Sequence, residues 1–138
     1  MENKGIILCA DDELSIRNLI GDILSFDFSD YHPEFFKDGS SLEKRLIDGN
    51  RNIRLVVTDN EMRPGISGSE IIRKYSKKSG FEKIPFILCY AGDQNLGESL
   101  VNEGYAFAYF SKPIGIKDFV ETIKKALNPV KEPTQLSQ

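Results

Sequence analysis

The sequence contains no tryptophan, a single histidine and two cysteines. The cysteines, Cys9 and Cys89, each lie inside an apolar run, and neither belongs to a CxxC motif or a His/Cys cluster. This spacing does not match a zinc site or a disulfide framework, so we expect two small buried thiols. His32 precedes Pro33 in a polar segment, and we expect it at the surface without a catalytic role.

Long apolar runs are missing as well. No stretch approaches the roughly 20 residues that a membrane span needs. The N-terminal residues lead straight into a short apolar run and show no signal-peptide pattern. We therefore expect a cytoplasmic protein that does not contact a membrane.

Basic charge is not in excess either. The 18 lysines and arginines are outnumbered by 21 aspartates and glutamates, which gives a formal net charge of −3, and the two signs are interspersed. This distribution argues against direct binding of nucleic acid, which needs a basic patch. Hydrophobic residues make up 40% and charged residues 28% of the chain, as is typical of an ordinary globular protein.

The chain length allows one domain, which we assign to residues 1–128 and which should bury roughly two thirds of its unfolded surface. Residues 129–138 contain two prolines and mostly polar side chains without an apolar period. We expect a flexible tail there, either the natural end of a stand-alone domain or the start of a linker.

Five short apolar runs alternate with segments of helical period. This alternation predicts an α/β fold in which a parallel sheet is covered by helices on both faces. The predicted strands are Gly5 to Ala10, Tyr31 to Lys37, Ile53 to Thr58, Pro85 to Tyr90 and Phe107 to Ser111.

The segments between and after these strands predict five helices. The first carries an apolar stripe at helical spacing, formed by Ile16, Leu19, Ile20 and Ile23. Two capping boxes mark the starts of the second and third helices, Ser40 with Glu43 and Ser67 with Glu70.

Small residues mark the predicted ends of two helices. Ser79-Gly80 is expected to end the third helix, and Gly104 is expected to end a fourth helix over residues 95–103. The fifth helix is expected from Ile116 to Leu127, where lysines in the last turn complement the helix dipole.

Acidic residues follow two of the predicted strands. Asp11 and Asp12 come directly after the first strand, and Asp59 comes directly after the third. If these strands are parallel neighbours, three like charges meet, and a cation or a proton is needed to neutralise them. Lys112 follows the fifth strand and would offset part of the charge. The pattern predicts a divalent-metal site at the carboxyl ends of the strands.

Each of these residues also has a simpler interpretation. Asp11 or Asp12 could cap the helix that follows, and Lys112 could be a solvent-facing lysine before a turn proline. The presence of all four charged residues at strand ends favours the metal site over these interpretations.

The order and spacing of four motifs resemble the receiver domain of two-component response regulators, over residues 4 to about 128. The motifs are Asp11-Asp12-Glu13, Val57-Thr58-Asp59-Asn60-Glu61-Met62, Pro64-Gly65-Ile66-Ser67-Gly68 and Tyr109-Phe110-Ser111-Lys112-Pro113. The resemblance implies a flavodoxin-like fold, a doubly wound five-stranded parallel sheet of order 2-1-3-4-5 with five helices. In that order Cys9 and Cys89 lie about 9.6 Å apart, beyond the roughly 7 Å reach of a disulfide.

The resemblance also implies roles for the site residues. Asp59 would accept a phosphoryl group from a sensor histidine kinase or a phosphotransfer protein, and Lys112 would hold the phosphoryl oxygens. Mg²⁺ would be bound directly by Asp12, Asp59 and the backbone carbonyl of Glu61, and through water by Asp11. The metal and the lysine would neutralise charge during phosphoryl transfer. Such a phosphorelay module only phosphorylates and dephosphorylates its own aspartate, and is not otherwise an enzyme.

Two features depart from the family pattern. Receiver domains usually carry threonine or serine at the end of the fourth strand, where this chain has Tyr90, followed by the expected small residue Ala91. The tyrosine hydroxyl lies further from the backbone, and the ring could fill the space into which the switch aromatic, Tyr109, would swing. Tyr109 could also be a plain half-buried strand aromatic.

The loop after Asp59 has one extra residue around Arg63, which we interpret as a solvated charge.

The leading prediction is a phosphoacceptor receiver module that switches its binding to a downstream protein target or to a missing output domain. The alternative is a pseudo-receiver, a phosphorylation-independent interaction domain, which Tyr90 keeps open. A small Mg²⁺ phosphohydrolase is less suitable, because no insertion is long enough to build a substrate lid. A homodimer or partner contact could form through the fourth helix, fifth strand and fifth helix, although Lys117, Glu121 and Lys124 there also suit plain solvation.

Overall fold

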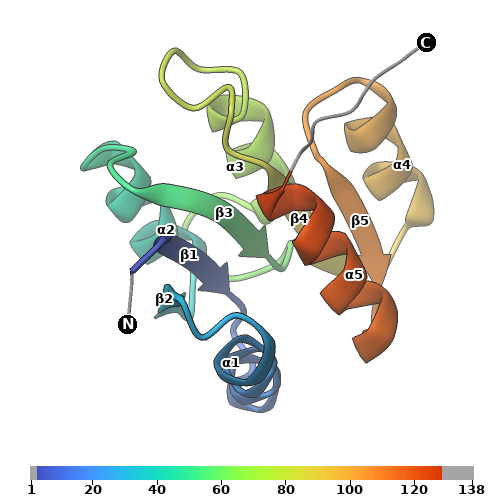
Figure 1. The fold of residues 1–138 in the computed structure, drawn as a ribbon. Helices are drawn as coiled ribbons and strands as arrows, with labels where there is room; N and C mark the ends of the chain where they lie inside the picture. The colour runs from blue at the N-terminus through green and yellow to red at the C-terminus, as the bar shows by residue number, and fades with distance from the viewer. Residues whose placement is uncertain (1–2, 129–138) are drawn as a thin grey trace, which may run out of the picture.

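The computed structural model describes residues 3–128, in which five strands alternate with five helices (Figure 1). In chain order the elements are β1 (Gly5–Ala10), α1 (Leu14–Asp27), β2 (Tyr31–Phe36), α2 (Gly39–Ile47), β3 (Ile53–Thr58), α3 (Gly68–Tyr75), β4 (Phe86–Tyr90), α4 (Gln94–Asn102), β5 (Ala108–Ser111) and α5 (Ile116–Leu127). The predicted tail, residues 129–138, lies outside the described residues.

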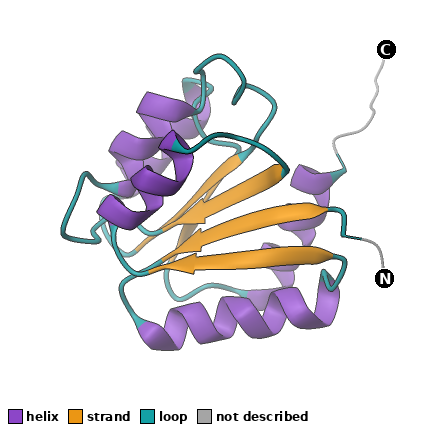
Figure 2. Ribbon diagram, turned by 90° about the vertical axis from the view of Figure 1, so that its left-hand side faces the viewer, coloured by secondary structure: helices purple, strands orange, loops and turns teal. Residues whose placement is uncertain are grey.

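The five strands form one parallel sheet in the order β2-β1-β3-β4-β5, which confirms the predicted flavodoxin-like topology. Figure 2 shows the strand arrows pointing the same way, so the carboxyl ends of the strands lie along one edge. The central strands β1, β3 and β4 are almost continuously buried because helices cover both faces. Strand order reverses between β1 and β3, the place where such sheets bind ligands.

The helices cover the two faces of the sheet in two sets (Figure 1). α1 and α5 pack on one face through a cluster that includes Ile23, Phe119 and the strand residue Val57. α2, α3 and α4 pack on the other face through a cluster that includes Leu42 and Leu100. Alternate strand residues supply the two clusters because successive side chains of a strand point to opposite faces.

The start of α2 differs from the prediction. Asp38, not Ser40, is the N-cap, and its side chain accepts a 2.7 Å hydrogen bond from the backbone N–H of Ser41. The predicted capping box of Ser40 and Glu43 is therefore wrong. The carboxylate of Asp38 caps the helix two residues earlier, and Glu43 instead accepts a hydrogen bond from Tyr75 of α3.

The start of α3 agrees with the prediction, but its end does not. Ser67 and Glu70 form the expected capping box, with hydrogen bonds of 3.2 and 2.9 Å. α3 ends at Tyr75, so the predicted end at Ser79-Gly80 is wrong. The chain continues in turns that bury Phe81 against Tyr75, with ring centroids 5.9 Å apart. Burial of this aromatic pair favours the turns over a longer helix.

The other boundaries match the predicted ones within one residue. α4 begins one residue early, at Gln94, because Asp93 caps it by accepting from the backbone N–H of Asn95 over 2.9 Å. Gly104 ends the region with a φ of 81°, the left-handed conformation expected there. α5 spans the predicted residues.

The two cysteines are packing residues, as predicted. Cys9 on β1 and Cys89 on β4 are both free and buried, and β3 separates their strands. Burial raises the pKa of Cys89 to about 12 and that of Cys9 further still, so both thiols stay protonated and unreactive near neutral pH.

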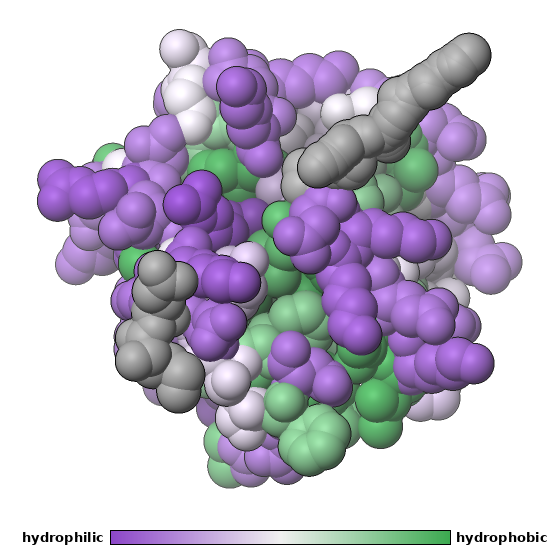
Figure 3. Space-filling view, in the orientation of Figure 1, coloured by the Kyte–Doolittle hydropathy of each residue, from purple (hydrophilic) through white to green (hydrophobic). Residues whose placement is uncertain are grey.

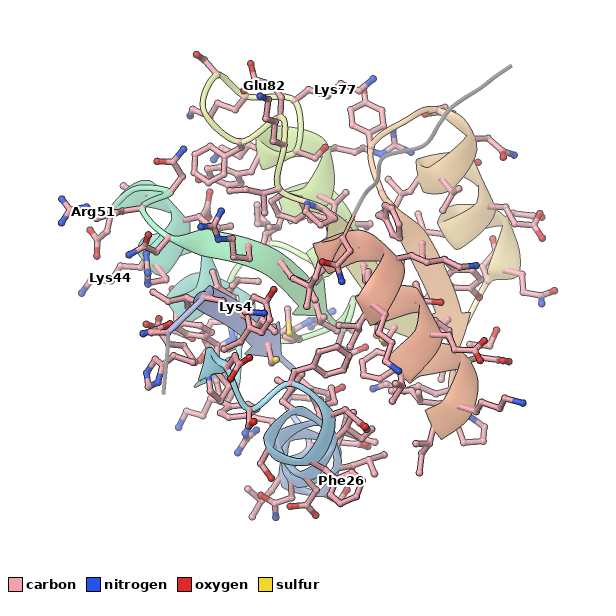
Figure 4. The ribbon with its side chains drawn as sticks, in the orientation of Figure 1. Lys4, Phe26, Lys44, Arg51, Lys77 and Glu82 are labelled. Atoms are coloured by element: carbon pink, nitrogen blue, oxygen red, sulfur yellow. The ribbon has the colours of Figure 1, made fainter. Side chains whose placement is uncertain are left out.

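Most of the surface in the view of Figure 3 is polar, and apolar residues gather in a band near the centre of that face. Phe26 is 87% exposed and points away from the sheet at the end of α1 (Figure 4). Across residues 3–128, no helix combines the length and the hydropathy that crossing a membrane requires.

Candidate functional site

Four charged side chains meet at the carboxyl edge of the sheet. Asp11 and Asp12 follow β1, Asp59 follows β3 and Lys112 follows β5. The backbone N–H of Asp59 donates to the carbonyl of Ala10 over 2.8 Å, which joins the ends of β3 and β1. The four residues that the sequence places at strand ends are thus neighbours in space.

The three carboxylates lie close together. One oxygen from each of Asp11, Asp12 and Asp59 lies within 4.8 Å of the other two. Asp11 and Asp59 are buried, with 1% and 7% of their surface exposed, whereas Asp12 is exposed. Repulsion among the carboxylates is poorly screened at the buried positions. Carboxylate oxygens are the ligands that Mg²⁺ and Ca²⁺ prefer, so the donor set fits a hard divalent cation.

Lys112 offsets part of this negative charge. Its Nζ donates to Asp11 Oδ2 over 2.7 Å and lies 3.4 Å from Asp59 Oδ2. Burial opposes the charged ammonium group, but the hydrogen bond to Asp11 and the attraction of both carboxylates outweigh burial and raise the pKa of Lys112. The lysine therefore stays charged, and its shorter contact is to Asp11 rather than to the predicted phosphoacceptor.

Both carboxylate oxygens of Asp11 already accept hydrogen bonds. Oδ2 accepts from Lys112, and Oδ1 accepts from the backbone N–H of Glu13 over 2.9 Å. The backbone carbonyl of Asp11 also accepts from Arg17 over 2.8 Å. Asp11 thus orders the turn into α1, although the N-cap of that helix is Glu13 and has no side-chain cap.

Asp59 is held in place by the residue that follows it. The N–H of Asn60 donates to Asp59 Oδ1 over 2.7 Å, and Asn60 Oδ1 accepts from the N–H of Ser69 over 2.8 Å. Asn60 is buried, so it links the acid firmly to the start of α3. No role was predicted for Asn60, and its place directly after the acid and before a capped helix is the signal that points to it.

The surroundings of Asp59 raise its pKa to about 6. Burial is the largest cause because it disfavours the ionised carboxylate, and the negative charge of Asp11 adds to it. The hydrogen bond from Asn60 and the charge of Lys112 act in the opposite direction. Near neutral pH the carboxylate is thus ionised at a cost in stability, and a bound cation would reduce that cost.

Glu61 lies in the loop between β3 and α3, with its side chain in solvent. Within residues 3–128 no backbone hydrogen bond ends on the Glu61 carbonyl, so no backbone N–H occupies this oxygen. The carbonyls of Met62 and Pro64, by contrast, accept from Gly39 and Ser40 at the start of α2, over 2.7 and 2.9 Å.

Tyr90 and Ala91 stand beside the charged cluster, at the end of β4. Tyr90 is half-buried, and its ring lies against Gly92, where the Cβ of any other residue would overlap it. The ring therefore folds over the β4–α4 loop. An open depression of about 540 Å³ lies at this place and is lined by Tyr90, Ala91, Gly92, Asp93, Gln94, Asn95, Ser111 and Lys112.

Tyr109 on β5 rests on α4. Its ring covers Gly97, at a distance that a Cβ there would not allow, and its Oη lies 3.2 Å from Ser111 Oγ. Tyr90 and Tyr109 thus each occupy the space left by a different glycine of the β4–α4 segment. Tyr109 is half-buried, a state that suits a switch aromatic and a plain strand aromatic alike.

No family model matches the chain. Among curated proteins, the polar-differentiation response regulator DivK of Brucella ovis is 29% identical over 124 residues, which are 90% of this chain and 96% of the relative. The protein of the same name from Brucella anthropi is 28% identical over an alignment of the same length. The similarity therefore extends over nearly the whole of both sequences.

Solved structures share the fold over nearly the whole chain. A response regulator receiver domain from Clostridium thermocellum has a TM-score of 0.78 and 27% identity, covering 91% of this chain and 95% of that one. The response regulator TrrA of Thermotoga maritima, solved in complex with Mg²⁺-BeF, has a TM-score of 0.72 and 31% identity, covering 92% and 100%. The likeness therefore extends over about nine tenths of this chain.

Proposed function

This chain belongs to the response-regulator receiver domains of two-component signalling, and we propose that it accepts a phosphoryl group on Asp59 with the help of Mg²⁺. The donor would be a phosphohistidine of a sensor histidine kinase or phosphotransfer protein. The observation that carries the proposal is the approach of Asp11, Asp12 and Asp59 to within 4.8 Å of one another, with Lys112 in contact.

The donor set suits Mg²⁺, which takes a few carboxylate ligands and keeps several waters. Asp12, Asp59 and the backbone carbonyl of Glu61 would hold the ion directly, and Asp11 would act through water. This division is supported by Asp11, since both of its carboxylate oxygens already accept hydrogen bonds. When bound, the ion neutralises negative charge on the phosphoryl oxygens.

The side chains position and neutralise the reacting groups. Asp59 would present an ionised oxygen to phosphorus, so that an O–P bond forms while the P–N bond of the phosphohistidine breaks and its electron pair returns to the imidazole. The hydrogen bond from Asn60 holds one oxygen of Asp59. Lys112, 3.4 Å from the other oxygen, would exchange its contact with Asp11 for a phosphoryl oxygen.

The phosphoryl group would add negative charge next to the β4–α4 loop and β5. We propose that this change alters the surface formed by α4, β5 and α5, which would bind a downstream protein, an output domain or a second copy of the chain. The chemistry is confined to Asp59 of the chain itself, so no separate substrate is proposed. We place this signalling in the cytoplasm.

A pseudo-receiver that binds partners without phosphorylation is the second candidate, and Tyr90 favours it. The Tyr90 ring covers Gly92 instead of presenting a short hydroxyl toward the charged cluster. A domain of this kind would keep the charged cluster but would not couple it to the rest of the fold.

Mass spectrometry after incubation with acetyl phosphate and Mg²⁺ separates the two functions. The expected result is one added phosphoryl group on the wild-type chain and none on Asp59→Asn or on a sample treated with a chelator. An unmodified wild-type chain, together with no response to beryllofluoride, would favour the pseudo-receiver.

A further inference from the structure

The loop that follows Asp59 packs closely against the start of α2, with Gly65 on the loop side of the contact and Gly39 on the helix side. Gly39 donates its N–H to the Met62 carbonyl over 2.7 Å, and Ser40 donates to the Pro64 carbonyl over 2.9 Å. These bonds attach the β3–α3 loop to a helix far from it in sequence. The loop also carries Glu61, one residue before the first bond.

The same contact leaves no space for side chains. A Cβ on Gly39 would overlap the backbone carbonyl of Ile66, and a Cβ on Gly65 would overlap the backbone N–H of Ser40. Gly65 also has a φ of 109°, in the region that favours glycine. The obstructing atoms belong to the backbone, so they can give way only if the loop itself moves.

We propose that Gly39 and Gly65 are positioning residues for the metal site, a role that rests on the proposed binding of Mg²⁺. The two glycines bring the β3–α3 loop down onto α2, and so set where the Glu61 carbonyl stands relative to the carboxylates of Asp12 and Asp59. The residue after Glu61, Met62, is 1% exposed, and its burial holds this part of the loop against the core. The carbonyl is thus placed by packing that lies outside the cluster itself.

This role has a consequence for ion selectivity. Mg²⁺ requires near-octahedral oxygen ligands at about 2.0–2.1 Å, whereas Ca²⁺ accepts about 2.3–2.6 Å and a flexible geometry. A displaced Glu61 carbonyl therefore harms Mg²⁺ binding more than Ca²⁺ binding. A general loss of stability would weaken the binding of both ions alike.

The test is calorimetric titration of the full chain with Mg²⁺ and with Ca²⁺, comparing the wild type with Gly39→Ala. We expect Mg²⁺ affinity to fall about tenfold, in the range seen when supporting residues of metal sites are changed, and Ca²⁺ affinity to fall clearly less. Gly115→Ala is the matched control, because nothing lies within 4 Å of a Cβ there. An unchanged Mg²⁺ affinity in Gly39→Ala, or an equal loss for both ions, would overturn the role of the glycines.

Amide hydrogen exchange of the wild type tests the same role without a variant. The amides of Gly39 and Ser40 should be protected in the free protein and exchange more slowly still with Mg²⁺, since binding and loop closure are linked. Rates that do not respond to Mg²⁺ would overturn the inference even if Gly39→Ala fails to fold. A wild type that binds no Mg²⁺ would overturn the proposed function as well, which distinguishes the two failures.

Discussion

Two regions next to Asp59 use glycine in opposite ways. Around the β3–α3 loop, at the first residues of α2 and α3, glycine brings backbone against backbone. Gly68 faces the carbonyl of Asp59 itself, and Gly39 faces the carbonyl of Ile66. A carbonyl cannot turn aside unless its whole segment moves, so this side of the site is built to keep one geometry.

In the β4–α4 segment glycine instead makes room for aromatic rings. Tyr90 lies on Gly92 and Tyr109 lies on Gly97. A ring can leave such a contact by rotating about its χ angles, at little cost to the backbone. The comparison indicates that the side expected to hold the ion, around Gly39, Gly65 and Gly68, is rigid, and we call it the rigid side. The side expected to respond to phosphorylation, around Gly92 and Gly97, is adjustable, and we call it the adjustable side.

The largest effect on stability is expected when a side chain is added to a glycine on the rigid side. In Gly68→Ala the new Cβ would overlap the Asp59 carbonyl, so α3 or the end of β3 must shift. We expect the free energy of unfolding to fall by about 3 kcal/mol, near the upper end for overpacked sites. Urea unfolding without metal measures it, with Gly115→Ala as the control. A loss below about 1 kcal/mol would show that this side yields as easily as the other.

The second-largest effect on stability is expected from the charge of Asp59, which the rigid side holds next to other acids. The folded-state pKa of Asp59, about 6, lies above its ordinary 3.8, so the folded chain binds a proton more tightly than the unfolded chain. The contribution of the Asp59 carboxyl group to stability is therefore complete below about pH 4, is lost as the pH rises through about 6, and does not change further above that.

Asp59→Asn removes this cost. Without metal the variant should be more stable than the wild type by about 2 kcal/mol at pH 7.5, less than the full pKa shift implies because solvent screens part of the charge, and no different near pH 4. Urea unfolding at the two pH values measures the difference, and Mg²⁺ should stabilise only the wild type appreciably. Equal stabilisation by the substitution at both pH values would mean that charge is not its cause.

The sequence alone predicts much of this rigid side but not its close contacts. The strand ends are readable because apolar runs stop at Asp11 and Asp59, and the strand order follows from the family resemblance. The fit of Gly39 against Ile66 is not readable, because it joins two segments whose approach is set by tertiary packing. No local pattern marks which glycine meets a distant carbonyl.

The errors have the same origin. Ser40 and Glu43 match a capping box locally, but Asp38 caps α2 and Glu43 is drawn to Tyr75 of another helix. Ser79-Gly80 matches a helix end locally, but α3 ends earlier, at Tyr75, and the turns that follow bury Phe81. In each case a contact between distant segments overrides a correct local preference.

On the adjustable side, Tyr90→Thr should have a smaller effect on stability. The half-buried ring leaves Gly92, and we expect a loss of about 1 kcal/mol from the apolar area exposed. The larger change should be in dynamics, with the Tyr109 ring becoming mobile on adding beryllofluoride and Mg²⁺, as judged by NMR line widths. Tyr90→Phe keeps the ring and serves as control. Identical behaviour of Tyr109 in wild type and Tyr90→Thr would contradict a coupling role for Tyr90.

The smallest net effect on the free energy of unfolding is expected for Gly97→Ala, because two opposing contributions nearly cancel. Alanine favours the helix by about 1 kcal/mol over glycine, but its Cβ displaces the Tyr109 ring and with it the contact to Ser111. The two effects should nearly cancel in urea unfolding.

A double-mutant cycle separates them. In a Tyr109→Ala background no ring is displaced, so Gly97→Ala should stabilise by the full helix preference of about 1 kcal/mol. A coupling free energy of that size between positions 97 and 109 would show that the cost of Gly97→Ala in the wild type comes from displacing a movable ring. If Gly97→Ala instead costs as much as Gly68→Ala in both backgrounds, the obstruction lies in the backbone, and the two sides of the site do not differ in the way their contacts indicate.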